Sequence, residues 1–133
     1  MSWRIPLFDL DYDEREETAV MDVLHSKWLT MGDVTLRFEA AFAEYVGVKH
    51  AFAVSNGTTA LHLACLAVGI EPGAEVIVPG LTFVATAACA RYVGATPVFA
   101  DIGGPNDLTL SPASIEAQIT PRTQAIIVMH YAG

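Results

Sequence analysis

The sequence predicts an α/β fold in which helices cover a mainly parallel sheet. Two observations carry this prediction. From residue 51 onward, short apolar runs of strand length alternate with helical patterns. The runs lack the polar alternation of a half-exposed strand, which is typical of strands covered on both faces. Strands that are separated by helices pair in parallel, because each crossover returns the chain to the same end of the sheet.

Two amphipathic helices precede the sheet. The first is expected over residues 11–26, where apolar side chains recur among acids that gather at the N-terminal end. Residues 27–33 form an exposed turn. The second helix ends at Gly47, and its apolar side chains are Leu36, Phe38, Phe42, Tyr45 and Val46.

Four strands and three further helices follow in alternation. The strands are expected over residues 51–54, from Glu75, over 96–100 and over 125–129, and the helices over 59–68, 84–92 and 112–119. Apolar residues surround the helix over 59–68, so we expect it to be buried on most sides. Ser111 and Pro112 begin the last helix, and residues 103–107 are interpreted as a turn.

Composition predicts a soluble, cytoplasmic protein. The chain has 133 residues, 53% of them hydrophobic, which is enough for a substantial core. No apolar run approaches the roughly 18 residues of a membrane helix, and the first residues do not resemble a secretory signal. Cys65 and Cys89 lie in apolar helical patterns, where cysteine acts as a small hydrophobe. We therefore expect no metal site.

The charge excludes one class of partner. A formal net charge of −8, with seven basic residues spread thinly, gives no footprint for nucleic acid. A small anionic substrate remains compatible with it, because such a ligand needs only a local cluster of amides and cations.

The segment Ser55–Ala64 has the chemistry of an anion site. It joins an apolar run to a helix, and Gly57, Thr58 and Thr59 stand beside the first unpaired helical amides. The alternative is equally simple, since Ser55 and Asn56 can merely cap the helix while Gly57 turns the chain.

Several motifs together resemble one family. They are Ser-Asn-Gly-Thr-Thr-Ala-Leu-His-Leu from residue 55, Pro-Gly-Ala-Glu-Val-Ile-Val-Pro from 72, Leu-Thr-Phe-Val-Ala-Thr from 81, Gly-Ala-Thr-Pro-Val-Phe-Ala-Asp-Ile from 94 and His-Tyr-Ala-Gly from 130. Their succession resembles the DegT/DnrJ/StrS family of pyridoxal-phosphate-dependent sugar aminotransferases, over nearly the whole chain.

The resemblance implies a fold and a domain organisation. The fold is the N-terminal part of the aspartate-aminotransferase-like (fold type I) large domain, a three-layer α/β/α arrangement. We expect a single incomplete domain over residues 1–133, with N-terminal helices in 1–48 and the first strands and helices of the cofactor-binding large domain in 49–133. The resemblance also implies that the protein is a homodimer.

The resemblance implies roles for six residues. The amides of Gly57 and Thr58 hold the phosphate of pyridoxal 5'-phosphate, the ring of Phe83 stacks on its pyridine, and His130 faces the cofactor pocket. Without the resemblance, Phe83 is a core aromatic, because most buried Phe side chains only pack.

Trp28 and Thr30 lie in a loop that borders the sugar-nucleotide site in the family, although a loop tryptophan also anchors loops by packing. Two positions depart from the pattern. Lys27 stands where many relatives carry glycine, and Ala88 where they often carry asparagine.

The implied activity is transfer of an amino group from an amino acid such as glutamate to a nucleotide-linked keto-sugar, in polysaccharide or antibiotic-sugar biosynthesis. This chemistry needs a Schiff-base lysine. The family supplies it beyond residue 133, so we expect no catalytic residue here and an inactive chain when alone. The alternatives are a sugar dehydratase of the same family, or a non-catalytic phosphate-binding fragment or partner subunit.

Overall fold

The computed structural model describes residues 9–131. The chain divides into two compact units, Met1–Ala53 and Val54–Gly133. Among the described residues, the N-terminal unit has helices only, whereas the C-terminal unit holds the strands. Within the described residues, no helix combines the length and the apolar character needed to cross a bilayer.

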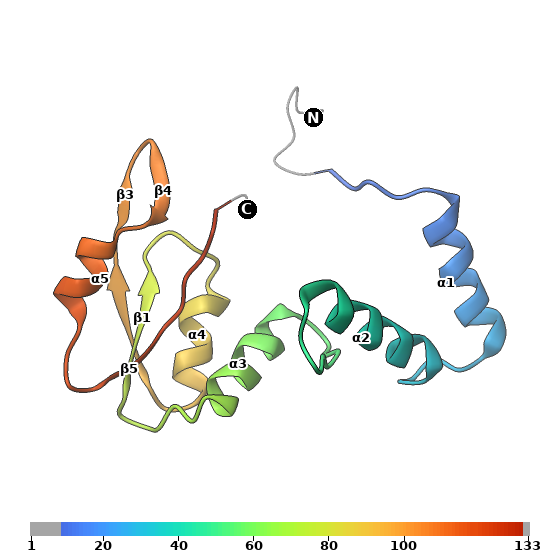
Figure 1. Ribbon diagram of the computed structural model, residues 1–133, viewed down its shortest axis with the longest axis horizontal. Coiled ribbons are helices and arrows are strands. Elements are labelled where there is room, and N and C mark those ends of the chain that lie inside the picture. Colours follow the sequence, from blue (N-terminus) through green and yellow to red (C-terminus); the bar gives the residue numbers. More distant parts are fainter. Residues whose placement is uncertain (1–8, 132–133) are drawn as a thin grey trace. The chain divides into compact units, whose positions relative to one another are not determined.

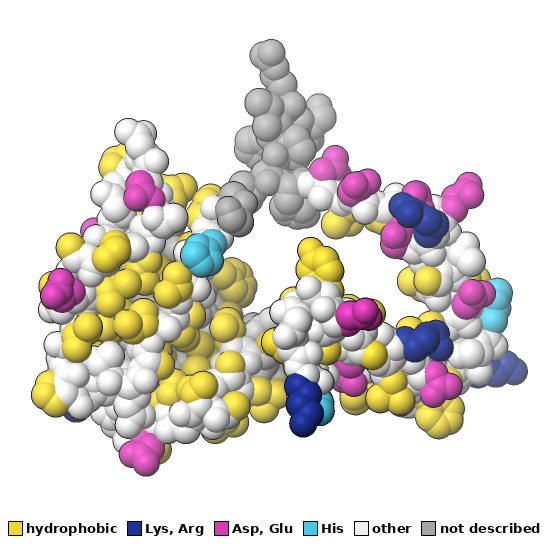
Figure 2. Space-filling model, in the orientation of Figure 1, with side chains coloured by type: hydrophobic (Ala, Val, Ile, Leu, Met, Phe, Trp, Pro, Cys, Tyr) yellow, Lys and Arg dark blue, Asp and Glu magenta, His cyan; other side chains and the backbone are white. Residues whose placement is uncertain are grey.

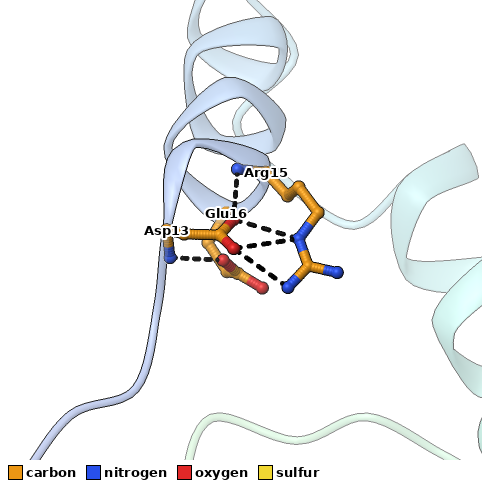
Figure 3. Close-up of polar contacts among 3 residues, drawn as sticks. All are labelled: Asp13, Arg15 and Glu16. Carbon is orange, nitrogen blue, oxygen red and sulfur yellow. Dashed lines mark hydrogen bonds and ion pairs between the residues drawn. The ribbon is translucent and has the colours of Figure 1, made fainter.

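The N-terminal unit begins its helix α1 (Glu14–Ser26) with a capping box, which Figure 3 shows. The Asp13 side chain accepts a hydrogen bond from the Arg15 amide at 2.9 Å, and the Glu16 side chain accepts one from the Asp13 amide at 2.8 Å. Hydrogen bonds from the Arg15 side chain hold the pKa of Asp13 below its ordinary value. This cap places the start of the helix three residues after the predicted Asp11.

Helix α2 (Asp33–Val46) ends as predicted at Gly47, whose φ of 72° is left-handed. The strand predicted over residues 51–54 is wrong, because these residues have no strand partner in the described chain. Instead the Ala53 amide donates to Glu39 Oε1 at 2.7 Å. A side chain of α2 is therefore the acceptor for this amide, where in a sheet the acceptor is a carbonyl of the neighbouring strand.

The C-terminal unit contains a three-stranded sheet of order β2-β1-β5, formed by Glu75–Pro79 (β1), Thr96–Ala100 (β2) and Thr123–Ile126 (β5). Both pairings are parallel, with Ile77 opposite Val98 on one side and opposite Ile126 on the other. The predicted parallel sheet is therefore confirmed. The strand β5 lies two to three residues earlier than predicted, although the Ile127 amide still donates to Ile77 O at 2.8 Å.

Helices cover both faces of this sheet, as Figure 1 shows. Helices α3 (Gly57–Ala67) and α4 (Ala85–Tyr92) pack on the face of Val76 and Val78, and α5 (Pro112–Gln118) packs on the face of Ile77. Neighbouring residues of β1 thus point to opposite layers, and every residue of this strand is buried. The central strand is the core of the three-layer arrangement.

Both cysteines lie in the layer between α3, α4 and the sheet. Cys65 and Cys89 are buried, which confirms that they act as small core residues. Burial is the main cause that raises the pKa of the Cys89 thiol to about 11, and the neighbouring Cys65 adds to it. The thiol therefore stays protonated and poorly reactive at neutral pH.

Helix α3 is much more exposed than the sequence predicts. Cys65 is its one buried residue, while Leu63, Leu66 and the following Val68 are exposed. One side of the helix packs on α4, and no element of the described C-terminal unit covers the other side. Figure 2 shows hydrophobic side chains spread over the visible face of this unit.

A hairpin stands where the sequence predicts only a turn. Strands β3 (Ile102–Gly104) and β4 (Asp107–Leu110) pair antiparallel. Asp107 Oδ1 accepts from the Thr109 amide at 3.0 Å and so stiffens the start of β4. The helix α5 begins as predicted, with the Ser111 side chain accepting from the Ser114 amide at 3.3 Å.

A buried carboxylate fastens the start of the central strand. The side chain of Glu75 is only 8% exposed. Its carboxylate accepts hydrogen bonds from Thr120 Oγ1 at 2.5 Å and from the Arg122 guanidinium, whose Nε lies at 3.0 Å. These bonds, led by that of Thr120, lower the pKa of Glu75. The cluster ties β1 to the segment that leads into β5.

We predict that Glu75→Gln lowers the free energy of unfolding at pH 7. The folded-state pKa lies below the ordinary value of 4.5, so the carboxylate stabilises the fold fully above that pH and less as the pH falls through the folded pKa. Urea unfolding at pH 7 and at about pH 3 measures the difference. Glu71→Gln, at an exposed position, is the control. Equal gaps between wild type and Glu75→Gln at both pH values would contradict the prediction.

Lys27 ends α1 in a conformation that favours glycine. Its φ of 58° is the one positive value at a non-glycine residue in the described chain, and its amide donates to Leu24 O at 3.1 Å. We expect Lys27→Gly to raise the free energy of unfolding by about 1 kcal/mol, because a Cβ is disfavoured there. Lys27→Ala removes the charge but keeps the Cβ, so chemical denaturation should show no comparable gain for it.

Candidate functional site

Three predicted cofactor positions belong to one edge of the sheet. The strands β1, β2 and β5 are parallel, so their carboxyl ends share an edge. The helices α3 and α4 run back along the sheet and begin at that same edge, as Figure 1 shows. Gly57 starts α3, Phe83 lies between β1 and α4, and His130 follows β5. Ligands of open α/β sheets bind at such edges.

The first turn of α3 offers free backbone donors. Asn56 is its N-cap, and the Asn56 side chain accepts from the Thr59 amide at 2.9 Å. The Ser55 and Thr59 hydroxyl oxygens lie 3.1 Å apart and hold the turn in place. Within the described residues, no acceptor is found for the amides of Gly57 and Thr58. This turn therefore presents two N–H groups at the positive end of a helix.

Gly57 keeps the approach to these amides open. A Cβ at this position would meet no other atom within 4 Å, and the backbone of Gly57 is not left-handed. Neither the fold nor a turn therefore requires glycine here. The missing side chain instead leaves room for a group from outside the chain, so the residues fit a phosphate.

Phe83 is not a core residue of this chain. Its side chain is 74% exposed, so the alternative that it only packs in the core is wrong for the described fold. The turn around it is held by a contact of 2.8 Å between the Thr82 and Thr86 hydroxyls and by a bond from the Thr86 amide to Phe83 O at 3.0 Å. An exposed ring on a held turn beside a helix start can cover a flat ligand.

Asp101 and His62 in the C-terminal unit have structural contacts. The Asp101 carboxylate accepts from the Ile102 amide at 2.8 Å, which is the contact of a turn cap. His62 lies edge-on to Tyr92 with 5.4 Å between ring centroids. His130 is exposed. The described residues contain no group of three metal-binding side chains.

Trp28 and Thr30 line a cavity of about 790 Å³ in the N-terminal unit. The indole of Trp28 donates from Nε1 to Met31 O at 3.0 Å. A Cβ added at Gly32 would lie 2.6 Å from that nitrogen, so the indole rests against the glycine backbone. Trp28 is nevertheless 64% exposed, so local packing leaves much of the residue accessible, and contact with a substrate stays a prediction.

Sequence reasoning missed two side chains of this cavity, Thr35 and Arg37. Both lie in the first turns of α2, directly after the predicted loop. The recognisable signal was a basic residue four positions after Asp33, on the helix side that faces the loop.

Relatives of known name match the chain over most of its length. GDP-perosamine synthase from Caulobacter vibrioides is 50% identical over 122 residues, which are 91% of this chain and 33% of that protein. The chain spans about a third of the length of the relatives it matches.

Solved structures agree with this match. A 3-amino-5-hydroxybenzoic acid synthase is 39% identical with a TM-score of 0.83, covering 92% of this chain and 32% of that one. A GDP-4-keto-6-deoxymannose-3-dehydratase with a trapped PLP–glutamate geminal diamine is 31% identical with a TM-score of 0.82, covering 92% and 33%. These matches confirm the predicted α/β fold as the N-terminal third of a fold type I enzyme. Since the family model matches residues 10–133, the chain belongs to the DegT/DnrJ/EryC1/StrS aminotransferase family.

Proposed function

We propose that this chain is the N-terminal, cofactor-phosphate-binding part of a pyridoxal-phosphate-dependent aminotransferase of nucleotide-sugar metabolism. The observation that carries the proposal is the first turn of α3, where Gly57 and Thr58 offer amides without an acceptor in the described chain and a Cβ would find open space. Membership of the family and the PLP–glutamate adduct in a matched structure support it.

The side chains and amides have distinct tasks in this proposal. Gly57 and Thr58 bind the dianionic phosphate, which the positive end of α3 favours. Phe83 covers the flat face of the pyridine ring and excludes water from it. His130 and the Thr58 hydroxyl supply polar contacts at the same edge. When bound, pyridoxal phosphate supplies an electron-withdrawing ring that allows an amino group to be exchanged.

In this proposal the chain contributes cofactor binding and no catalytic residue. Its two lysines, Lys27 and Lys49, belong to the N-terminal unit, whereas the phosphate site belongs to the C-terminal unit. Since the resemblance places the Schiff-base lysine beyond residue 133, we propose that the chain alone holds the cofactor without a covalent bond and is inactive. In the working enzyme the partners are a nucleotide-linked keto-sugar, an amino-acid donor such as glutamate and a second copy forming a homodimer.

A sugar dehydratase is the second candidate function. The matched GDP-4-keto-6-deoxymannose-3-dehydratase favours it, because its TM-score of 0.82 is close to the 0.83 of the synthase. Both candidates use the phosphate turn of α3 in the same way. Assay of glutamate-dependent amino transfer against loss of water from a nucleotide keto-sugar separates them.

We predict that Gly57→Ala weakens pyridoxal phosphate binding about tenfold without loss of stability. A Cβ crowds the phosphate at the free amides but meets nothing in the chain itself, and alanine favours a helix more than glycine does. Equilibrium dialysis with pyridoxal phosphate gives the affinity, and thermal unfolding gives the stability. Unchanged affinity in this variant would remove the main support for the proposed function.

Phe83→Ala is expected to weaken cofactor binding severalfold, because an aromatic lid of this kind contributes about 1 kcal/mol. Phe38→Ala, which removes a ring that is 57% exposed on α2, is the matched control. Fluorescence titration of both variants with pyridoxal phosphate makes the comparison. Equal losses in the two variants would show that Phe83 has no specific part in the site.

A further inference from the structure

The link between Asn56 and Gly57 has the features of a chemically labile peptide bond. An asparagine that precedes glycine cyclises readily, because no Cβ on the second residue crowds the attack of its nitrogen on the asparagine side-chain carbonyl. Both residues are exposed, so water reaches this link from outside. The sequence has one other asparagine, Asn106, and it precedes Asp107 instead of a glycine.

The Gly57 nitrogen is available as the attacking group. Within the described residues, its N–H has no acceptor that would hold the proton. The space beside it is open, since a Cβ built on Gly57 would meet no other atom within 4 Å. Gly57 also begins α3, and the positive end of a helix stabilises the negative charge that this nitrogen acquires when it loses its proton.

The cap of α3 slows the attack, because it holds the Asn56 side chain. Asn56 Oδ1 accepts from the Thr59 amide at 2.9 Å and from Thr59 Oγ1 at 3.2 Å, and Asn56 Nδ2 donates to Ser55 Oγ at 3.1 Å. Cyclisation requires the side chain to rotate away from these partners. All three bonds are exposed, so the cap opens locally while the sheet stays folded.

We propose that Asn56 is a site of spontaneous deamidation and that the product has a weakened phosphate site. The second half of this proposal rests on the proposed function, whereas the first half does not. In the first step the Gly57 nitrogen loses its proton to hydroxide and bonds to Asn56 Cγ, while Nδ2 gains a proton from water and leaves as ammonia. Water then opens the succinimide ring. Breaking the ring bond to Cγ gives aspartate, and breaking the ring bond to the main-chain carbonyl carbon gives isoaspartate.

Both products place a carboxylate beside the amides of Gly57 and Thr58. Aspartate caps a helix as well as asparagine does, so α3 keeps its start. The new negative charge stands next to the proposed position of the phosphate and opposes the binding of a dianion. Isoaspartate also adds one methylene to the backbone before Gly57, which displaces the two amides. The modification therefore acts on the phosphate site more than on the fold.

Mass spectrometry of the chain, incubated without cofactor at mildly alkaline pH, tests the modification. Trypsin separates the two asparagines, with Asn56 in peptide 50–91 and Asn106 in peptide 92–122. We expect peptide 50–91 to gain the mass that separates a hydroxyl from an amino group, faster than peptide 92–122 does and with release of ammonia. Gly57→Ala should slow this gain about tenfold, because its Cβ crowds the attacking nitrogen. Thr59→Ala removes one bond of the cap and should speed the gain severalfold.

Asn56→Asp tests the effect on the phosphate site. Equilibrium dialysis should show pyridoxal phosphate binding about tenfold weaker than in wild type, with the far-UV circular dichroism unchanged. Asn106→Asp adds the same charge in the loop between β3 and β4, so it is the matched control and should bind as wild type does.

Three results overturn the proposed modification: no mass gain in peptide 50–91, a gain no faster than in peptide 92–122, or an equal rate in Gly57→Ala. Equal affinities of Asn56→Asp and Asn106→Asp overturn the second half. A chain that deamidates but binds no pyridoxal phosphate contradicts the proposed function, and the second half with it, so the two failures are distinguishable.

Discussion

Complete burial of the strand Glu75–Pro79 is the constraint on which the C-terminal unit depends. A strand between two parallel neighbours needs crossovers on its faces: α4 lies between β1 and β2 in the chain, and α5 lies between β2 and β5. All three strands then finish at one edge, and two helices begin there. The predicted cofactor positions Gly57 and Phe83 follow from this arrangement, because each stands where a helix begins.

The two candidate sites use different physical means. At the start of α3, the proposed phosphate site consists of backbone amides and the open space beside Gly57. Between α1 and α2, the Trp28 indole is fixed against Gly32 in a cavity lined by side chains of both helices. The first arrangement depends on the sheet, whereas the second depends on local helix ends and one left-handed residue, Lys27. Substitutions therefore affect the two sites through different parts of the fold.

The sequence was sufficient for elements that are specified by local chemistry. The caps at Ser111 and Gly47 and the strand Thr96–Ala100 were predictable, because turn residues and apolar runs define them directly. The strand at 51–54 and the buried α3 were not, because both depend on neighbours that the described residues lack. An apolar run indicates that a segment favours burial, but it does not specify which element packs against it. Arg37 was missed because the cavity that it lines is formed by two helices.

The outer edge of β5 favours association between chains at high protein concentration. This strand pairs only with β1 in the described sheet, and the run Thr-Gln-Ala-Ile-Ile-Val-Met from residue 123 has neither charge nor proline. Such a run is a template for cross-β growth, and charged flanking residues act as gatekeepers against it. Arg122 is the charged gatekeeper on one flank of this run. Its hydrogen bond to the Glu75 carboxylate holds the guanidinium beside the start of β5.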